Sequence, residues 1–83
     1  MKLLLFVETP WTKRPVSVPG TVINTTGAWG YGYSQRQIEI RSQADRWWLV
    51  ECENAEAGRA IIESRKMSLS SPLGRVLASG GKP

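Results

Sequence analysis

The chain has no histidine and a single cysteine, Cys52, among its 83 residues. Zinc sites in proteins are built mainly from cysteine and histidine, and an internal disulfide needs two cysteines, so the usual frameworks of both kinds are excluded. Histidine is also the commonest general base, and its absence leaves acid–base chemistry to aspartate, glutamate, lysine or tyrosine. We therefore expect a protein of a reducing compartment that is not an enzyme and carries no metal or cofactor.

Long apolar runs are also missing. The apolar stretch that starts at Leu3 ends at Glu8, which is shorter than the roughly 7 to 15 residues of an export signal. No stretch approaches the roughly 20 residues of a membrane span. We expect residues 3–7 to form a buried strand in a cytoplasmic protein without a membrane partner. So short a chain predicts a single domain over residues 1–79 with a flexible tail at 80–83.

The charge balance is basic but modest. Eleven lysines and arginines against seven acids give a net charge of +4. This favours anionic partners without identifying one, because the bases are spread along the chain. A solvated surface that keeps a small domain in solution also explains this balance, and we favour it over an anion-binding face.

Residues 46–53 carry the densest run of large apolar side chains and predict a central strand. Side chains alternate between the faces of a strand, and both faces are apolar here. The alternation separates two sets: Trp48, Val50 and Cys52 on one face, Trp47 and Leu49 on the other. A strand covered on both faces belongs in the middle of a sheet.

A helix is predicted to follow this strand over residues 54–66. Asn54 supplies a side-chain oxygen for the N-cap, with acids early and bases late in the segment. Gly58 lies inside the helix, where glycine costs about 1 kcal/mol relative to alanine. We therefore expect close packing against Gly58 and a buried, inert Cys52 nearby.

The remaining segments complete an α+β prediction. Alternation and β-branched residues predict strands near 16–18, 21–25, 28–33, 38–40 and 67–70, and Ser71 before Pro72 predicts a short helix over 73–78. We expect an antiparallel sheet of four or five strands, one helix (about 54–66) packed on one face, and this short C-terminal helix. The alternative is a small β-barrel plugged by the helix. The predicted core is Leu3, Leu5, Val7, Val22, Ile38, Ile40, Trp48, Val50, Ala57, Ile61 and Leu69.

Trp29, Tyr31 and Tyr33 alternate with glycines and would share one face of an extended segment. Exposed aromatics beside bases such as Arg36 are typical of single-stranded nucleic-acid binding, since every base can stack. The same residues could instead fill the core, because a chain with one phenylalanine must recruit other aromatics. Both interpretations stay open.

Trp11 stands in a proline-bounded loop between Pro10 and Pro15, next to Lys13 and Arg14. Tryptophan, tyrosine and arginine dominate the energetics of protein interfaces. This loop tryptophan either closes one end of the sheet or contacts a partner.

Two short segments resemble parts of known families. Residues 5–7 and 50–61 are similar to the first strand and to the third strand plus helix of an RNA-recognition motif, whose stacking aromatics would fall at Trp47 and Leu49. Residues 67–77 are similar to a segment in the C-terminal domain of bacterial transcript-cleavage elongation factors. Only Trp47 matches a stacking aromatic, and the second similarity is confined to its segment. We assign the chain to neither family.

These patterns predict a non-enzymatic binding protein. The first hypothesis is a protein-binding adaptor or inhibitor of the accessory type encoded by phages and mobile elements, acting on a host or defence complex. The alternative is a single-stranded nucleic-acid-binding module that uses residues 29–33, and a homodimer through an edge strand or the aromatic face is a further expectation. The candidate partner-binding residues are Trp11, Lys13, Arg14, Trp29, Tyr31, Tyr33 and Arg36.

Overall fold

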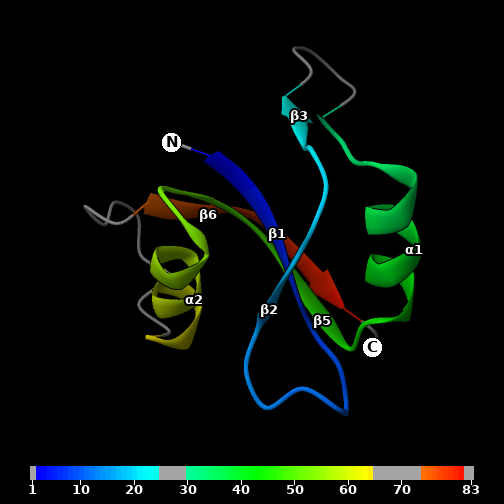
Figure 1. Cartoon of the computed structure of the whole chain (residues 1–83), viewed down its shortest axis with the longest axis horizontal. Helices are drawn as coiled ribbons and strands as arrows, with labels where there is room; N and C mark the ends of the chain where they lie inside the picture. Colours follow the sequence, from blue (N-terminus) through cyan, green and yellow to red (C-terminus); the bar gives the residue numbers. More distant parts are fainter. Residues whose placement is uncertain (1, 25–29, 65–73, 82–83) are drawn as a thin grey trace.

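The computed structural model describes residues 2–24, 30–64 and 74–81. A four-stranded antiparallel sheet has the order β2-β1-β5-β6, and β3 pairs with β4 in a separate two-stranded sheet. The strands are β1 (Lys2–Glu8), β2 (Val16–Val18), β3 (Ile23–Asn24), β4 (Tyr31–Gly32), β5 (Arg46–Cys52) and β6 (Gly74–Gly81). The helices are α1 (Gln35–Gln43) and α2 (Ala55–Glu63), which lie on opposite sides of the sheet (Figure 1). The predicted α+β class is confirmed.

The face of β5 that carries Trp48 packs against α2. Phe6 of β1 lies opposite Trp48 in the strand register and is fully buried with it. This cluster is completed by Val50, Cys52, Ile61 and Ile62. Helix α2 therefore covers the face that the alternation of β5 predicts to be apolar.

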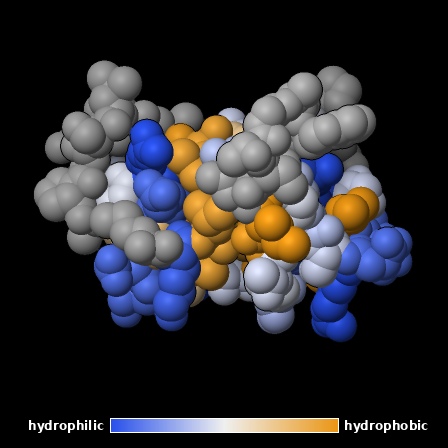
Figure 2. Space-filling view, turned by 90° about the horizontal axis from the view of Figure 1, so that it is seen from above, coloured by the Kyte–Doolittle hydropathy of each residue, from blue (hydrophilic) through white to orange (hydrophobic). Residues whose placement is uncertain are grey.

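The other face of the sheet packs against α1 and the residues around it. Its buried cluster consists of Leu5, Val7, Val18 and Ala44, with Tyr33, Ile40 and Trp47 partly buried against it. Seen from above, apolar residues gather in the middle of the visible face, with hydrophilic residues on either side (Figure 2). One face of β5 therefore packs against α2, and the other packs against α1 and the residues around it.

Most of the predicted core is confirmed, with one clear error. Six predicted core residues are buried: Leu5, Val7, Val22, Trp48, Val50 and Ile61. Leu3, Ile40 and Ala57 are half-buried, whereas Ile38 is 43% exposed and does not belong to the core. Leu69 lies outside the described residues.

Helix α2 begins where the sequence predicts. The Asn54 side chain accepts a hydrogen bond from the backbone N–H of Ala57 at 2.8 Å. A Cβ on Gly58 would lie 2.7 Å from the Phe6 ring and 2.8 Å from Cys52 Sγ, so glycine allows the helix to approach the sheet closely. Burial raises the pKa of the Cys52 thiol and keeps it protonated. Neither helix of the described chain is long and apolar enough to span a membrane.

Replacing Asn54 with alanine is expected to lower the free energy of unfolding by about 0.5 to 2 kcal/mol, because the Ala57 N–H loses its acceptor. Urea denaturation measures this change. The matched control, Asn54→Asp, keeps a side-chain oxygen at the N-cap and should stay close to the unsubstituted protein. An unchanged midpoint for Asn54→Ala would contradict the assigned helix start.

The segment predicted as a strand around Ile38 and Ile40 is helix α1 instead. Ser34 caps this helix, since its hydroxyl accepts from the Gln37 N–H at 3.3 Å while Gln37 Oε1 accepts from the Ser34 N–H at 3.0 Å. The two isoleucines are too few to establish an alternating pattern. The capping box is the sequence signal that outweighs them.

Gln37 also attaches α1 to the sheet. It is fully buried, and its amide donates to the Val18 carbonyl at 3.4 Å. A Cβ on Gly20 would lie 2.7 Å from Gln37 Cδ and from Ser34 Oγ, so the chain after β2 passes directly against the helix start. A polar residue thus takes the one fully buried position of this helix, which weakens the apolar periodicity that would reveal it.

The prediction of a helix over residues 73–78 is wrong. Its described residues, 74–78, belong to strand β6. This strand pairs with β5 from Cys52↔Gly74 to Arg46↔Gly81. Gly74 has φ 133°, and a Cβ there would overlap the Glu51 carbonyl oxygen. Gly80 and Gly81, expected in a tail, are paired residues of the same strand. The predicted strand at 67–70 lies outside the described residues.

The described residues between β2 and α1 contain less strand than the sequence predicts. Of the described residues in the segments 21–25 and 28–33, Ile23 pairs with Gly32 and Asn24 with Tyr31, and the others lie outside the strands. Trp29 lies outside the described residues. The predicted row of alternating aromatics is therefore described only at Tyr31 and Tyr33.

Candidate functional site

Trp11 lies in the connection between β1 and β2 and is 87% exposed. Hydrogen bonds define a turn around it: the Trp11 N–H donates to Thr9 Oγ1 at 3.3 Å and the Thr12 N–H donates to the Thr9 carbonyl at 3.2 Å. Thr12 Oγ1 in turn accepts from the Thr9 N–H at 3.0 Å. The turn therefore holds a large apolar side chain in solvent.

Two arginines connect this loop to α2. Nε and Nη2 of Arg14 each donate to a different carboxylate oxygen of Glu63 at 2.8 Å. Nε of Arg59 donates to the Pro15 carbonyl at 2.9 Å. Arg59 and Glu63 are four residues apart and therefore lie on the same side of α2. This spacing is the sequence signal by which the two residues could have been assigned to one shared contact.

The ion pair shifts the pKa values of both Arg14 and Glu63. The hydrogen bond from Arg14 lowers the pKa of the Glu63 carboxyl, and Glu63 raises the pKa of Arg14. Both side chains are well exposed, at 62% and 36%, so solvent screens the pair and its contribution to global stability is small. Its structural effect is to hold the loop against the end of α2.

The attachment of the loop is expected to depend on pH. Because the folded pKa of Glu63 is lowered, the pair is present above the ordinary glutamate pKa of about 4.3 and is lost as the pH falls through the lower folded value. A carboxyl NMR titration of Glu63 should give a midpoint below the ordinary value. The Arg14→Gln variant should return that midpoint toward the ordinary value. Identical midpoints in both proteins would contradict the ion pair.

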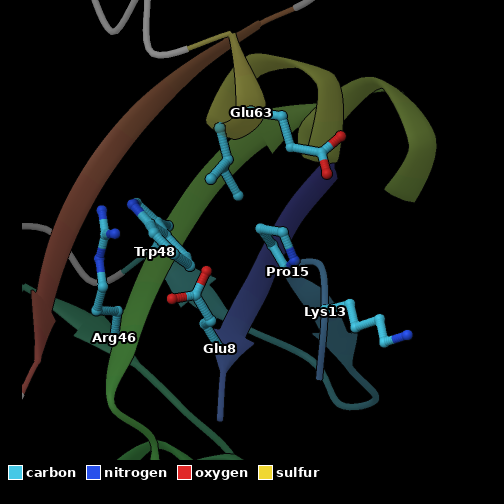
Figure 3. A pocket seen from close by; sticks show the side chains of 7 residues that line it. Glu8, Lys13, Pro15, Arg46, Trp48 and Glu63 are labelled. Atoms are coloured by element: carbon cyan, nitrogen blue, oxygen red, sulfur yellow. The ribbon is translucent and has the colours of Figure 1, made fainter. Parts of the chain in front are cut away.

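A cavity of about 340 Å³ opens between the loop, β5 and the end of α2. It is lined by Glu8, Lys13, Pro15, Arg46, Trp48, Ile62 and Glu63. The Glu8 carboxylate is directed toward Trp48, whereas the Lys13 amine points away from the cavity (Figure 3). The Arg46 guanidinium lies 4.9 Å from the Trp48 ring centroid. Charged side chains make up most of this lining, and Pro15, Trp48 and Ile62 are its apolar part, so the cavity suits a partner side chain that can make both kinds of contact.

A second, shallower groove borders the same loop. It has a volume of about 420 Å³ and is lined by Thr12, Lys13, Arg14, Pro15, Val16 and Arg59. Three of these residues are bases and none is an acid. Val16 adds exposed apolar surface beside them, with 42% of its surface accessible.

Tyr33 lies elsewhere and contributes to packing. It meets Trp47 edge to face, with ring centroids 6.5 Å apart at 77°. The Arg41 guanidinium lies 4.6 Å from the Tyr33 centroid and 4.8 Å from the Trp47 centroid. Burial raises the pKa of Tyr33. Trp47, the residue that resembles an RNA-binding aromatic, is therefore in contact with two side chains, and its indole also lies against Gly80.

The structure divides the predicted site residues into two groups. Trp11, Lys13 and Arg14 share the loop between β1 and β2, whereas Tyr31 lies in β4 and Arg36 in α1, at a different end of the molecule (Figure 1). Sequence reasoning missed Arg46, Arg59 and Glu63, which come from β5 and α2. The described residues contain no group of three or more metal-binding side chains.

No protein-family model matches the sequence, and no curated protein or solved structure matches it significantly. The structure is a small α+β domain in which the loop that carries the exposed Trp11 is bonded to α2 through Arg14 and Arg59.

Proposed function

We propose that this chain is a non-enzymatic binding protein that holds a protein partner, as an adaptor or inhibitor, through the loop around Trp11. The observation that carries the proposal is the 87% exposure of Trp11 on a turn fixed by hydrogen bonds. Tryptophan contributes more to interface energetics than most residues when it is desolvated by a partner. A host or defence complex is the kind of target that we propose for it.

The braces on the loop support this proposal. A partner that binds a mobile loop must order it, and each immobilised side chain costs about 0.5 to 1.5 kcal/mol. Here Glu63 and Arg59 of α2 already hold the loop at Arg14 and Pro15. Binding through a preorganised tryptophan therefore avoids part of that entropy loss.

The cavity beside Trp48 gives the partner a complementary contact. Its volume of about 340 Å³ falls in the lower range of small-molecule sites and is large enough for one side chain of a partner. Trp11 would enter the partner while a partner side chain enters the cavity. Such paired insertion is how interface hot spots are commonly arranged.

Binding of single-stranded nucleic acid stays the second proposal. Tyr33 packs against the buried cluster of Leu5, Val7, Val18 and Ala44, and Arg41 lies over its ring. A base needs an open ring face for stacking, so this tyrosine is a poor platform. A homodimer through β2 or β6, the two edges of the four-stranded sheet, also stays a prediction.

Site-specific photo-crosslinking tests the protein-binding proposal. A photoreactive phenylalanine analogue replaces Trp11, or replaces Ile38 as the matched exposed control, and the protein is irradiated in a lysate of the cells that make it, with and without nuclease. We expect a nuclease-resistant protein adduct from position 11 and none from position 38. Adducts that disappear with nuclease, or equal adducts from both positions, would overturn the proposal.

A further inference from the structure

The loop that carries Trp11 borders a groove whose charged residues are all basic. The groove between the loop and α2 is lined by Lys13, Arg14 and Arg59 and by no acid. We propose that the partner segment that docks beside Trp11 is an acidic stretch of polypeptide, with a carboxylate against Lys13 in this groove. This inference rests on the proposed protein-binding function and specifies the chemistry of its partner.

Lys13 is the available charge of the groove. It is exposed, lines both cavities, and forms no ion pair or hydrogen bond with any residue in the ranges 2–24, 30–64 and 74–81. Its amine points outward in Figure 3. A partner carboxylate can therefore pair with Lys13 without breaking a contact within the described chain.

The two arginines supply fixed donors at the same place. A guanidinium has five N–H donors, and toward described residues Arg14 uses Nε and Nη2 on Glu63 while Arg59 uses Nε on Pro15. The remaining N–H groups are held in position by those bonds. Arginine pairs well with carboxylates because its planar donors match two oxygens at once.

The neighbouring acids favour a polypeptide over a nucleic acid. Glu8 and Glu63 line the cavity beside Trp48, which Lys13 and Pro15 join to the basic groove. A continuous phosphate backbone crossing both would meet repulsion from these carboxylates. A polypeptide can place an acidic residue in the groove and a neutral one in the cavity. Val16 lines the groove and adds an exposed apolar contact for the same segment, and the exposed Trp11 precedes Lys13 by two positions in the loop.

Selection from a displayed random-peptide library tests both the site and its chemistry. The library is selected on the unsubstituted protein and, in parallel, on Trp11→Ala. We expect peptides that are captured only when Trp11 is present and that contain more aspartate and glutamate than the starting library. Enrichment without dependence on Trp11 would overturn the proposed function and this inference together.

The most enriched peptide is then synthesised with a fluorophore and titrated at physiological salt. Lys13→Glu is expected to weaken binding about tenfold, because it replaces an attraction to the peptide carboxylate with a repulsion and slows association. The matched control is Lys2→Glu, which makes the same charge change at the other end of β1 and should change affinity less than about twofold. Arg14 and Arg59 are unsuitable for this test because they also brace the loop.

The remaining outcomes separate the protein-binding function of the Trp11 loop from the acidic chemistry of its partner. Peptides that depend on Trp11 but carry no excess of acids, or equal losses in Lys13→Glu and Lys2→Glu, would overturn the acidic partner and leave Trp11 as the anchor. A fluorescent single-stranded oligonucleotide of equal charge is titrated in the same way. Tighter binding of the oligonucleotide with the same dependence on Lys13 would assign the groove to nucleic acid and overturn the inference.

Discussion

Trp48→Ala is expected to lower the free energy of unfolding by about 3 to 5 kcal/mol, the range for large aromatic truncations in a core. Trp48 is 3% exposed and packs with Phe6 under α2. Alanine would leave a hole between the sheet and the helix, and the Arg46 guanidinium would lose the ring beneath it. Denaturant titration followed by circular dichroism measures the change.

Trp11→Ala is the matched control for stability, because it removes the same side chain from an 87% exposed position. Its free energy of unfolding should stay within about 0.5 kcal/mol of the unsubstituted protein. A stable, soluble Trp48→Ala protein, or equal losses in the two variants, would contradict the assignment of the Trp48 face to the core.

Trp11→Ala is also expected to weaken the complex with the protein partner by at least about 2 kcal/mol, which is roughly 30-fold in Kd. Trp11 is 87% exposed on a loop that Arg14 and Arg59 connect to α2, so a partner can bury nearly all of its indole. Isothermal titration with the partner recovered by crosslinking measures the loss.

Ile38→Ala is the control for this binding experiment, since Ile38 is 43% exposed in α1 and belongs to neither cavity. Its affinity should stay within about twofold of the unsubstituted protein, as for residues outside an interface. If the partner binds Trp11→Ala with unchanged affinity, the loop around Trp11 is not part of the interface.

The central part of the fold was predictable because its signals are local and agree with one another. The alternation of β5 predicts two apolar faces, and both are buried as expected. Asn54 predicts the start of α2, and Gly58 predicts the close approach of that helix to the sheet. Each of these signals depends on residues that are neighbours in the chain.

Two segments were not predictable from apolar patterns. Helix α1 presents Gln37 to the protein, so its buried side carries a polar residue that periodicity does not count. Strand β6 contains a stretch whose local sequence suits a helix, and its pairing with β5 overrides that preference. Tertiary contacts commonly outweigh propensities of this size.

The sequence by itself determined the composition limits, the two-faced central strand and the capped helix after it, and it supplied the hypothesis that the loop around Trp11 contacts a partner. Only the tertiary structure decided that Lys13 lines one cavity with Arg46 and Glu63 and a second with Arg14 and Arg59, while Tyr33 packs with Trp47. The physical reason is the distance along the chain over which each kind of interaction acts. Caps and alternation act over a few residues, whereas the surface is assembled by antiparallel pairing and by ion pairs such as Arg14 with Glu63, which lie 49 positions apart.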